Sequence, residues 1–525
     1  MVSTEDVAKV IDRLDCNKSP GTDQIRVRDL KLIKNSISPV IAKFINMCLK
    51  KGVYPNELKK AIIRPIRKQG SHQEYTNYRP IAILNVLNKI TKKLIVKQVS
   101  DFLENNNIIS DVQYGFRPNR STDMALSKFT DDVNTALNEQ KLVMTIFIDF
   151  KKAFDTLDHD GLLQSMEECG IRGPVNTWFR NYLKDRTLEV NISGTSSDVG
   201  RIKYGVPTGS VYGPVGYIIH VNGMTNVIKS SSTYMYADDT CLMYCDKDPK
   251  NIQKVMQKDL DNTIRWAHDN GIIINVSKTK CMLISSPYSH QKQVNIVIKG
   301  HTYDCLHSSG TSGMVGCRCE QIEQVESYKY LGLTIDNKFS WNLHIDQVCK
   351  KLRSVLGKMY YLKYMTSRGI LYMIYHALAD STIGYGLGSY GLTFPVHLNK
   401  IKALQIRLLK NLACNKIKNE CNKEYEKLFK ICKIVPIDKK IKMTLVVEQF
   451  MKSEHKKERE YGYPTRQSRK RKYVVPRTKN YFGRRTRGWI VPTLHNELPP
   501  DLLGGVVSKN HLKNILKKHY LSLCP

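Results

Sequence analysis

The sequence predicts an α+β protein with a mainly helical C-terminal region, and three observations carry this prediction. The first hundred or so residues alternate amphipathic helical stretches with turn clusters. From Leu142 onward, short β-rich runs enter the pattern, with helical stretches between them. Beyond Trp341 the chain reads as mostly helical again.

Each part contains recognisable elements. In the first, VAKVIDRL and IAKFINMCLKKG have helical apolar spacing, and the second ends on Gly52, as helices often do. In the second, the strand candidates are LVMTIFIDF, LEVNISG and TYMYADDTCLMY, and a helical pattern runs from Asn251 to Asn270. A polar, Gly/Ser-rich segment from Ser285 to Gly316 is expected to be a loop insertion. After Trp489, LKNILKKHYLSL regains helical periodicity and is expected to dock back onto the body.

The charge balance indicates a polyanionic partner. Of 525 residues, 41% are hydrophobic and 25% charged, which suits a globular chain of two to four lobes. Lys and Arg number 82 against 48 Asp and Glu, for a formal net charge of +34. Because neutralised phosphates release counterions, nucleic acid is the favoured partner and an anionic membrane surface the weaker alternative.

Nothing in the sequence indicates export or membrane insertion. The N-terminus, MVSTEDVAKVIDRL, lacks the regions of a signal peptide, and no apolar run approaches a membrane span. The 14 cysteines are scattered, so an intracellular, reducing location in nucleus and cytoplasm is expected. Cys305, Cys317 and Cys319 do not have the spacing of a structural zinc site, and reduced thiols in a loop are expected there.

A basic run, RQSRKRKYVVPRTKNYFGRRTR, extends from Arg466 to Arg487 with ten Lys or Arg, no acid and interleaved aromatic residues. It is typical of a solvated tail or localisation signal, and equally of a surface for single-stranded nucleic acid. The candidate nucleic-acid-binding residues within it are Arg469, Lys470, Arg471, Arg484 and Arg485.

Two segments supply candidate catalytic carboxylates. TYMYADDTCLMY predicts a hairpin with Asp238 and Asp239 at its turn, although Asp is also an ordinary turn residue. TIFIDFKKAFD places Asp149 at the end of an apolar strand. Carboxylates that converge from separate strands repel one another unless a hard cation holds them. Two such ions would stabilise both the attacking and the leaving oxygen of a phosphoryl transfer.

Other segments suit a nucleotide substrate. Phe154, five positions after Asp149, is placed to exclude a 2′-hydroxyl, or else it is ordinary core packing. GVPTGSVYGP, with Thr208 and Gly209, is a Gly/Pro-rich loop whose bare backbone could approach a base pair. IRPIRKQGSHQEYTNYRPIAIL carries Arg64, Arg67, Lys68 and Arg79, which suit a triphosphate or are simply solvated.

Taken together and in order, these motifs resemble the reverse transcriptases of non-LTR retrotransposons of the LINE-type, jockey-like group. The matching motifs are NKSPGTDQI, IRPIRKQG, NYRPIAIL, QYGFRPNRSTDMAL, FIDFKKAFDTLDH, GVPTGSVYGP, YADD, NVSKTKCML and YKYLGLTID. The resemblance runs from about residue 5 to residue 340 and continues more weakly to WIVPTLHNELP. Nine motifs in the family's order are a specific signal, whereas YADD alone is not.

The resemblance implies a right-hand polymerase of fingers, palm and thumb, with these expected bounds: fingers and N-terminal helices 1–140, palm with part of the fingers 141–335, helical thumb 336–450, basic extension 451–525. It also implies roles for individual residues, which are the metal-binding triad Asp149, Asp238 and Asp239, the steric gate Phe154, the triphosphate ligands Lys68 and Arg79, the pyrophosphate-side Lys278 and the template-binding Arg117 and Arg120.

The expected activity is RNA-directed DNA synthesis with Mg²⁺ (two ions, with Mn²⁺ as the alternative), dNTPs, an RNA template and a DNA primer. The family usually has Gln where this chain has Thr208, so weakened catalysis and a nucleic-acid-binding remnant are the competing hypothesis. A group II intron maturase-like enzyme is a further alternative. The chain starts almost at the first polymerase motif, so an endonuclease is expected from a separate or missing segment.

Overall fold

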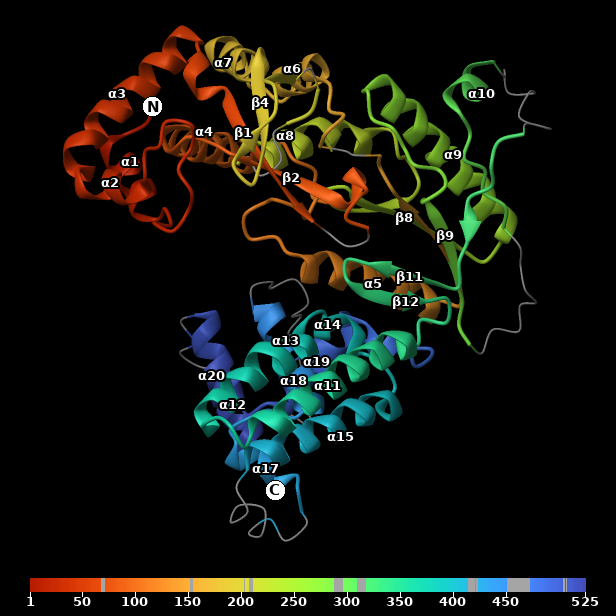
Figure 1. The fold of residues 1–525 in the computed structure, drawn as a ribbon. Coiled ribbons are helices and arrows are strands. Elements are labelled where there is room, and N and C mark those ends of the chain that lie inside the picture. Colours follow the sequence, from red (N-terminus) through yellow and green to blue (C-terminus); the bar gives the residue numbers. More distant parts are fainter. Residues whose placement is uncertain are drawn as a thin grey trace.

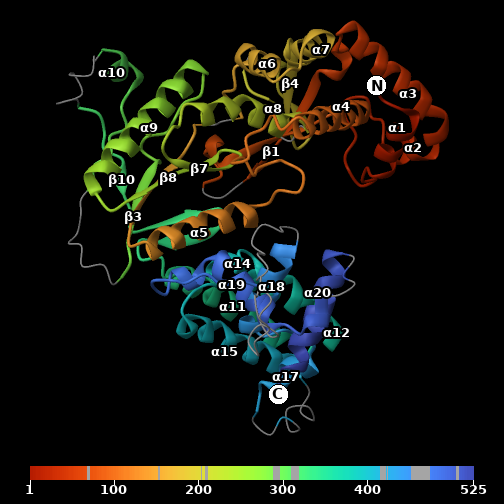
Figure 2. The same cartoon turned by 180° about the vertical axis from the view of Figure 1, so that it is seen from behind.

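A computed structural model describes residues 1–67, 71–151, 154–202, 204–206, 211–287, 296–308, 318–413, 421, 424–450, 473–503, 506 and 508–525. It confirms the α+β class (Figure 1). Helices and a small sheet at the N-terminal end are followed by a central sheet and then by a C-terminal group of helices (Figures 1 and 2).

The N-terminal helices pack on one another through a common apolar core. They are α1 (Thr4–Asp12), α2 (Val27–Leu32), α3 (Lys34–Lys51) and α4 (Val86–Asn105). The predicted helix end at Gly52 is confirmed, because Gly52 caps α3 in a left-handed conformation with φ 65°.

The first sheet follows these helices. It contains β1 (Lys60–Arg67), β2 (Tyr78–Ile83), β4 (Arg186–Ile192), β5 (Thr195–Ser196) and β6 (Gly200–Ile202). β1 pairs antiparallel with β2 and parallel with β4. Between β3 and β4 in sequence lie α6 (His159–Glu168) and α7 (Gly173–Leu183).

The central sheet has the strand order β10-β9-β3-β8-β7. Its strands are β3 (Leu142–Ile148), β7 (Ser232–Tyr236), β8 (Asp239–Asp246), β9 (Lys280–Ile284) and β10 (Glu323–Gln324). Every residue of β3 is buried, because Val143 and Phe147 face one core cluster while Met144 and Ile146 face the other. A strand covered on both faces reads as a continuous apolar run, which is the pattern of LVMTIFI.

Helices and a hairpin cover the two faces of this sheet. One face packs against α8 (Tyr212–His220) and α9 (Pro249–Asp269). The other packs against α5 (Thr122–Asn138) and the hairpin of β11 (Ser327–Tyr330) and β12 (Leu333–Asp336). In both views α5 lies between the central sheet and the C-terminal helices.

The helical C-terminal region is confirmed. Its helices are α11 (Asn342–Leu362), α12 (Arg368–Ile374), α13 (Ser381–Gly384), α14 (Leu387–Tyr390), α15 (Pro395–Leu412), α17 (Lys427–Ile431), α18 (Ile437–Phe450), α19 (Arg487–Glu497) and α20 (Lys509–Ser522). Leu512 and Leu516 of α20 are buried in the same core as Val446 of α18, so the last helix docks back as expected. Within the described ranges, no helix has the length and apolar character needed to cross a membrane.

The expected loop insertion over residues 285–316 is only partly a loop. Ile296 and Ile298 are buried, and Tyr303–Ser308 forms the short helix α10 beside α9. Cys305 therefore lies on a helix. Although the segment is polar overall, Ile296 and Ile298 are buried and attach it to the core. Cys317 lies outside the described residues.

Candidate active site

Two neighbouring strands bring the predicted carboxylates to one edge of the central sheet. Asp149 directly follows β3, and Asp239 is the first residue of β8. These strands pair antiparallel, with Ile148 opposite Thr240. One step further along this register, Asp149 stands opposite Asp239. Side chains at such facing positions begin about 5 Å apart, so the two carboxylates share one site.

The predicted hairpin is confirmed, and its turn consists of Ala237 and Asp238 between β7 and β8. Ala237 has φ 59°, a left-handed conformation that is uncommon for alanine. The buried Gln113 side chain holds it, because its Oε1 accepts hydrogen bonds from the N–H groups of Ala237 (3.0 Å) and Gly115 (2.8 Å). A segment far away in the sequence thus fixes the turn that carries Asp238.

Gln113 and Gly115 together form a clamp on the Ala237–Asp238 turn, and Gly115 contributes to it by close approach of its backbone. A Cβ on Gly115 would lie 2.3 Å from the backbone nitrogen of Ala237, which is far inside van der Waals contact. Beside it, the Tyr114 N–H donates to the Met235 carbonyl at 2.8 Å, and Gln113 and Met235 form an isolated parallel β-bridge, so the segment lies along β7. Only glycine allows the two backbones to meet at this point.

A second turn holds Asp149. The Asn275 side chain donates from Nδ2 to Asp149 Oδ2 at 3.0 Å, and the Asn275 N–H donates to the Asp149 carbonyl at 2.7 Å. The buried Thr279 hydroxyl accepts from the Asp149 N–H at 3.3 Å. Both residues belong to the NVSKTK motif, so this motif orients the first carboxylate.

The electrostatics of the site favour a bound cation. Partial burial, and then the charge of Asp149, raise the pKa of Asp238. Partial burial, followed by the charges of Asp238 and Asp149, raises the pKa of Asp239 to about 6. Among the described residues, the oxygens of these three aspartates are not all within 4.8 Å of one another. So open an arrangement suits cations shared with substrate oxygens better than one tightly caged ion.

Phe154 lies next to this site. Its ring is half-buried, 5.0 Å from the ring of Tyr217 and 6.4 Å from that of Phe116. Tyr217 is fully buried, and burial together with the charges of Asp238 and Asp239 raises the pKa of its phenol. The Tyr217 side chain therefore lies close enough to both aspartates for their charges to act on its phenol, and it also packs against Phe154.

The Gly/Pro-rich loop is attached beside Phe154. The Val206 N–H donates to the Phe154 carbonyl at 3.0 Å, and the Gly205 N–H donates to the Leu157 carbonyl at 2.7 Å. Gly205 has φ 78°, and a Cβ there would lie 2.6 Å from the Asp155 carbonyl oxygen. Thr208 and Gly209, the predicted substrate contacts, lie outside the described residues.

The remaining predicted substrate ligands are only partly described. Lys278 is exposed in the turn after Asn275. Arg79 lies in β2, where its backbone faces Ile66, but its side chain is outside the described part. Lys68 is also outside it. The structure therefore brings together the three aspartates, Phe154 and the turn that carries Lys278.

The basic residues predicted to bind nucleic acid divide into exposed and buried groups. Arg117 is 8% exposed and forms a two-pronged ion pair with Glu104 at 2.7 and 2.9 Å. Arg120 is partly exposed and paired with Asp111. Arg117 therefore holds its own loop together, whereas Arg120 lies at the surface.

The basic run shows the same division. Arg484 is exposed, but Arg485 is 3% exposed, donates to the Phe339 carbonyl at 3.1 Å and lies over the rings of Phe394 and Tyr481, each at 4.5 Å. Carbonyl and aromatic groups therefore replace water around the guanidinium of Arg485, so its side chain packs inside the protein. Arg469, Lys470 and Arg471 lie outside the described residues.

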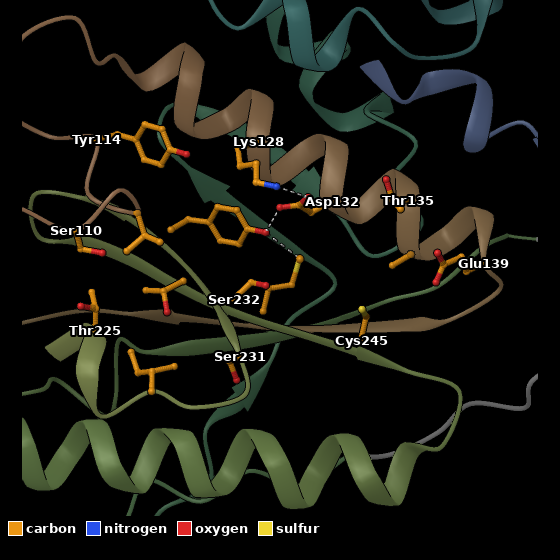
Figure 3. A pocket seen from close by; sticks show the side chains of 16 residues that line it. Ser110, Tyr114, Lys128, Asp132, Thr135, Glu139, Thr225, Ser231, Ser232 and Cys245 are labelled. Atoms are coloured by element: carbon orange, nitrogen blue, oxygen red, sulfur yellow. Dashed lines mark hydrogen bonds and ion pairs between the residues drawn. The ribbon is translucent and has the colours of Figure 1, made fainter. Parts of the chain in front are cut away.

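A separate cavity of about 580 Å³ lies between α5 and the β7–β8 hairpin (Figure 3). In it, Asp132 accepts hydrogen bonds from the Tyr234 hydroxyl at 2.6 Å and from Lys128 Nζ at 2.9 Å. None of the three aspartates of the site lines this cavity. Tyr114 lines it, so the cavity adjoins the clamp on the turn rather than the carboxylates.

Sequence reasoning missed Gln113, Gly115, Asn275 and Thr279 as functional residues. Both motifs, QYGF and NVSKTK, are visible in the sequence. In the structure, their polar and glycine residues contact the segments that carry the aspartates. No local pattern revealed which partner each would meet, because Gln113 and Ala237 are 124 positions apart.

Comparison with known proteins gives a consistent result. Residues 66–335, about half of the chain, match the family described as reverse transcriptase (RNA-dependent DNA polymerase). The chain is 27% identical to the RNA-directed DNA polymerase from mobile element jockey of Drosophila melanogaster, over 78% of this chain and 44% of that protein. It is 26% identical to the probable RNA-directed DNA polymerase from transposon X-element of the same fly, over 76% and 42%. It thus spans less than half of these relatives.

Among solved structures, apo telomerase from Candida tropicalis, truncated from its C-terminal domain, aligns over 50% of this chain and 58% of that chain. The sequence identity is 15% and the TM-score 0.35, too low to carry an argument.

Proposed function

Because the chain belongs to the reverse transcriptase family of RNA-dependent DNA polymerases, we propose that it extends a DNA primer on an RNA template with dNTPs. The observation that carries this proposal is the convergence of Asp149, Asp238 and Asp239 at one sheet edge, where partial burial and then their mutual charges raise the pKa of Asp238 and Asp239. A polymerase needs such a concentration of negative charge to bind the ions that phosphoryl transfer uses.

Enzymes of this family use divalent metal ions, and the site has the hard oxygen donors that Mg²⁺ prefers, with Mn²⁺ as the alternative. Asp149, Asp238 and Asp239 would hold two ions. When bound, such ions activate the primer 3′-oxygen and neutralise the leaving pyrophosphate. Asn275 and Gln113 keep the carboxylates in position: one bonds Asp149, and the other bonds the turn that carries Asp238.

The other site residues have distinct proposed roles. Phe154 excludes a 2′-hydroxyl with its half-buried ring, backed by Tyr217. Lys68 and Arg79 steady the triphosphate, Thr208 and Gly209 seat the nucleotide, and Lys278 lies on the pyrophosphate side. Template and primer are held mainly through backbone charge, to which Arg120, Arg469, Lys470, Arg471 and Arg484 contribute.

We propose that the lobes of a right-hand polymerase are the fingers and N-terminal helices 1–140, the palm with part of the fingers 141–335, the helical thumb 336–450 and a basic extension 451–525. On the proposed thumb, the exposed Tyr360 and Tyr364 lie near Lys363, whose Nζ is 4.0 Å from the centre of the Tyr360 ring and 4.6 Å from that of the Tyr364 ring. Rings and cations exposed together suit contact with a nucleic acid strand. The helices α19 and α20 pack on α18 of the proposed thumb.

The proposed biological setting is a non-LTR retrotransposon whose RNA is the template. A second candidate function is a nucleic-acid-binding remnant with feeble catalysis. Thr208 favours it, because the family usually has a longer Gln side chain at this position and Thr lacks its amide.

Primer extension with dNTPs or rNTPs, on RNA and on DNA templates, tests the proposal. The native protein should extend on RNA with dNTPs, and Phe154→Ala should admit ribonucleotides while retaining dNTP incorporation. Unchanged sugar selectivity in Phe154→Ala would return this ring to a packing role. Tight RNA binding without extension, restored by Thr208→Gln, would favour the remnant.

A further inference from the structure

A second cluster of metal-ligand side chains lies outside the proposed active site. His301, Cys305 and Cys319 each present a ligand atom, and these atoms are all within 4.8 Å of one another. His301 is 4% exposed, and both cysteines are half-buried. The cluster adjoins α10, which lies beside α9 at the end of the molecule opposite the N-terminal helices (Figures 1 and 2).

One distance within the cluster matches that expected between two ligands of a Zn²⁺ ion. His301 Nδ1 and Cys305 Sγ are 3.6 Å apart. A tetrahedral Zn²⁺ with Zn–S of about 2.3 Å and Zn–N of about 2.0–2.1 Å places its nitrogen and sulfur ligands about 3.6 Å apart. Two thiols and one imidazole are a soft donor set that suits Zn²⁺ and not the Mg²⁺ proposed for the aspartates. His301 lies two residues before the start of α10 and Cys305 lies in its first turn, so both donors are held at one end of this helix.

The backbone around the cluster is well fixed. Lys299 and Gln321 form an antiparallel β-bridge. On either side of it, the Gly300 N–H donates to the Glu320 carbonyl and the Ile322 N–H donates to the Ile298 carbonyl, each at 2.8 Å. This pairing brings Cys319 beside His301 although 18 positions separate them in the sequence. The cluster therefore depends on secondary structure rather than on the chance approach of two loops.

The same segment touches the turn that orients Asp149. A Cβ on Gly300 would lie 2.4 Å from Val276 Cγ1, and Val276 directly follows Asn275, which bonds Asp149. A cross-link at His301 thus acts one residue away from this contact. Whatever fixes the segment also limits the movement of the Asn275 turn.

We propose that His301, Cys305 and Cys319 bind a structural Zn²⁺ that joins residues 296–308 to residues 318–324 and steadies the turn holding Asp149. On binding, each thiol releases a proton to solvent and coordinates as a thiolate, while the imidazole coordinates in its neutral form. A water molecule or a fourth side chain completes the tetrahedron. Cys spacing alone predicts a loop without a zinc site. His301 adds a third ligand, and the backbone pairing around Gly300 brings this ligand beside Cys319.

Zinc content of the purified full-length chain, measured by elemental mass spectrometry, tests the proposal. About one Zn²⁺ per chain is expected in the native protein and in Cys169→Ser, a half-buried cysteine outside the cluster. Cys305→Ser, Cys319→Ser and His301→Gln should each lower the affinity for Zn²⁺ at least tenfold. No zinc in native protein supplied with Zn²⁺, or equal affinity in all variants, would mean that Cys305 and His301 share only a hydrogen bond.

Because a cysteine variant can also fail to fold, the native protein provides a second measurement. Substitution with Co²⁺ should produce a thiolate-to-cobalt charge-transfer band, absent from Cys319→Ser. Removal of zinc by a chelator should increase hydrogen exchange in residues 296–308 and 275–279 but not in α4. Unchanged exchange in the 275–279 turn would overturn its proposed dependence on the zinc site.

Discussion

Replacement of Gly115 by alanine tests the clamp on the Ala237–Asp238 turn. The new Cβ would lie 2.3 Å from Ala237 N, 2.9 Å from Tyr236 C and 3.1 Å from Ala237 Cα, all of them backbone atoms. Ordinary contact begins near 3.4 Å, so the two segments must separate by about 1 Å. No side chain can yield in their place.

A displacement of this size at a catalytic carboxylate lowers the rate by about 10²-fold. Overpacking also lowers the free energy of unfolding by about 1–3 kcal/mol. Single-turnover primer extension and thermal unfolding should show both effects, with RNA affinity nearly unchanged. Gly357→Ala is the matched control, because no atom lies within 4 Å of its added Cβ. A native extension rate in Gly115→Ala would refute the clamp.

Three further predictions concern other parts of the molecule. Asn275→Ala removes the 3.0 Å hydrogen bond to Asp149; at about 1.5–3 kcal/mol for a charged bond, extension should slow about 10- to 150-fold, and a rate within twofold of native would argue against this role. The pKa of Asp239 is raised from 3.8 to about 6, so the folded metal-free protein binds the extra proton. Its stability should fall as pH rises from about 4 to about 6. Mg²⁺ should remove this dependence in thermal unfolding, whereas Asp239→Asn should reduce it to the part that comes from Asp238, whose pKa is also raised. Arg485→Ala should lower stability by about 2 kcal/mol or more through lost ring and carbonyl contacts, whereas Arg484→Ala should leave melting unchanged and flatten the salt dependence of RNA affinity; equal melting of the two variants would contradict the burial argument.

Much of the architecture was predictable because it depends on local pattern. The β3 strand, the hairpin around Asp238 and the helix capped by Gly52 each arise from a short run of residues whose periodicity or turn chemistry suffices. The placement of Asp149 at a strand end also follows from its own segment. The register that brings it opposite Asp239 needs the pairing of β3 with β8, which no single segment encodes.

The remaining features depend on partners far away in the sequence. Arg117 and Arg485 look like surface charges until Glu104 and the aromatic rings that surround them are in place. In the same way, the turn clamp and the His301 cluster depend on pairs of segments that only the folded chain brings together. The polar composition around Ile298 predicted a loop. In the structure, a few buried apolar side chains attach this segment to the core.

Primer extension on an RNA template with Mg²⁺ and dNTPs, comparing the native chain with Asp238→Asn and with Asp198→Asn, tests the central claim most directly. Asp198 is an exposed aspartate in the β5–β6 connection, so its variant controls for loss of one negative charge. The account predicts extension by the native chain and by Asp198→Asn, and at most a trace by Asp238→Asn, with RNA binding equal in all three. Comparable extension by Asp238→Asn would contradict the assignment of the aspartates as the metal-binding centre of a polymerase.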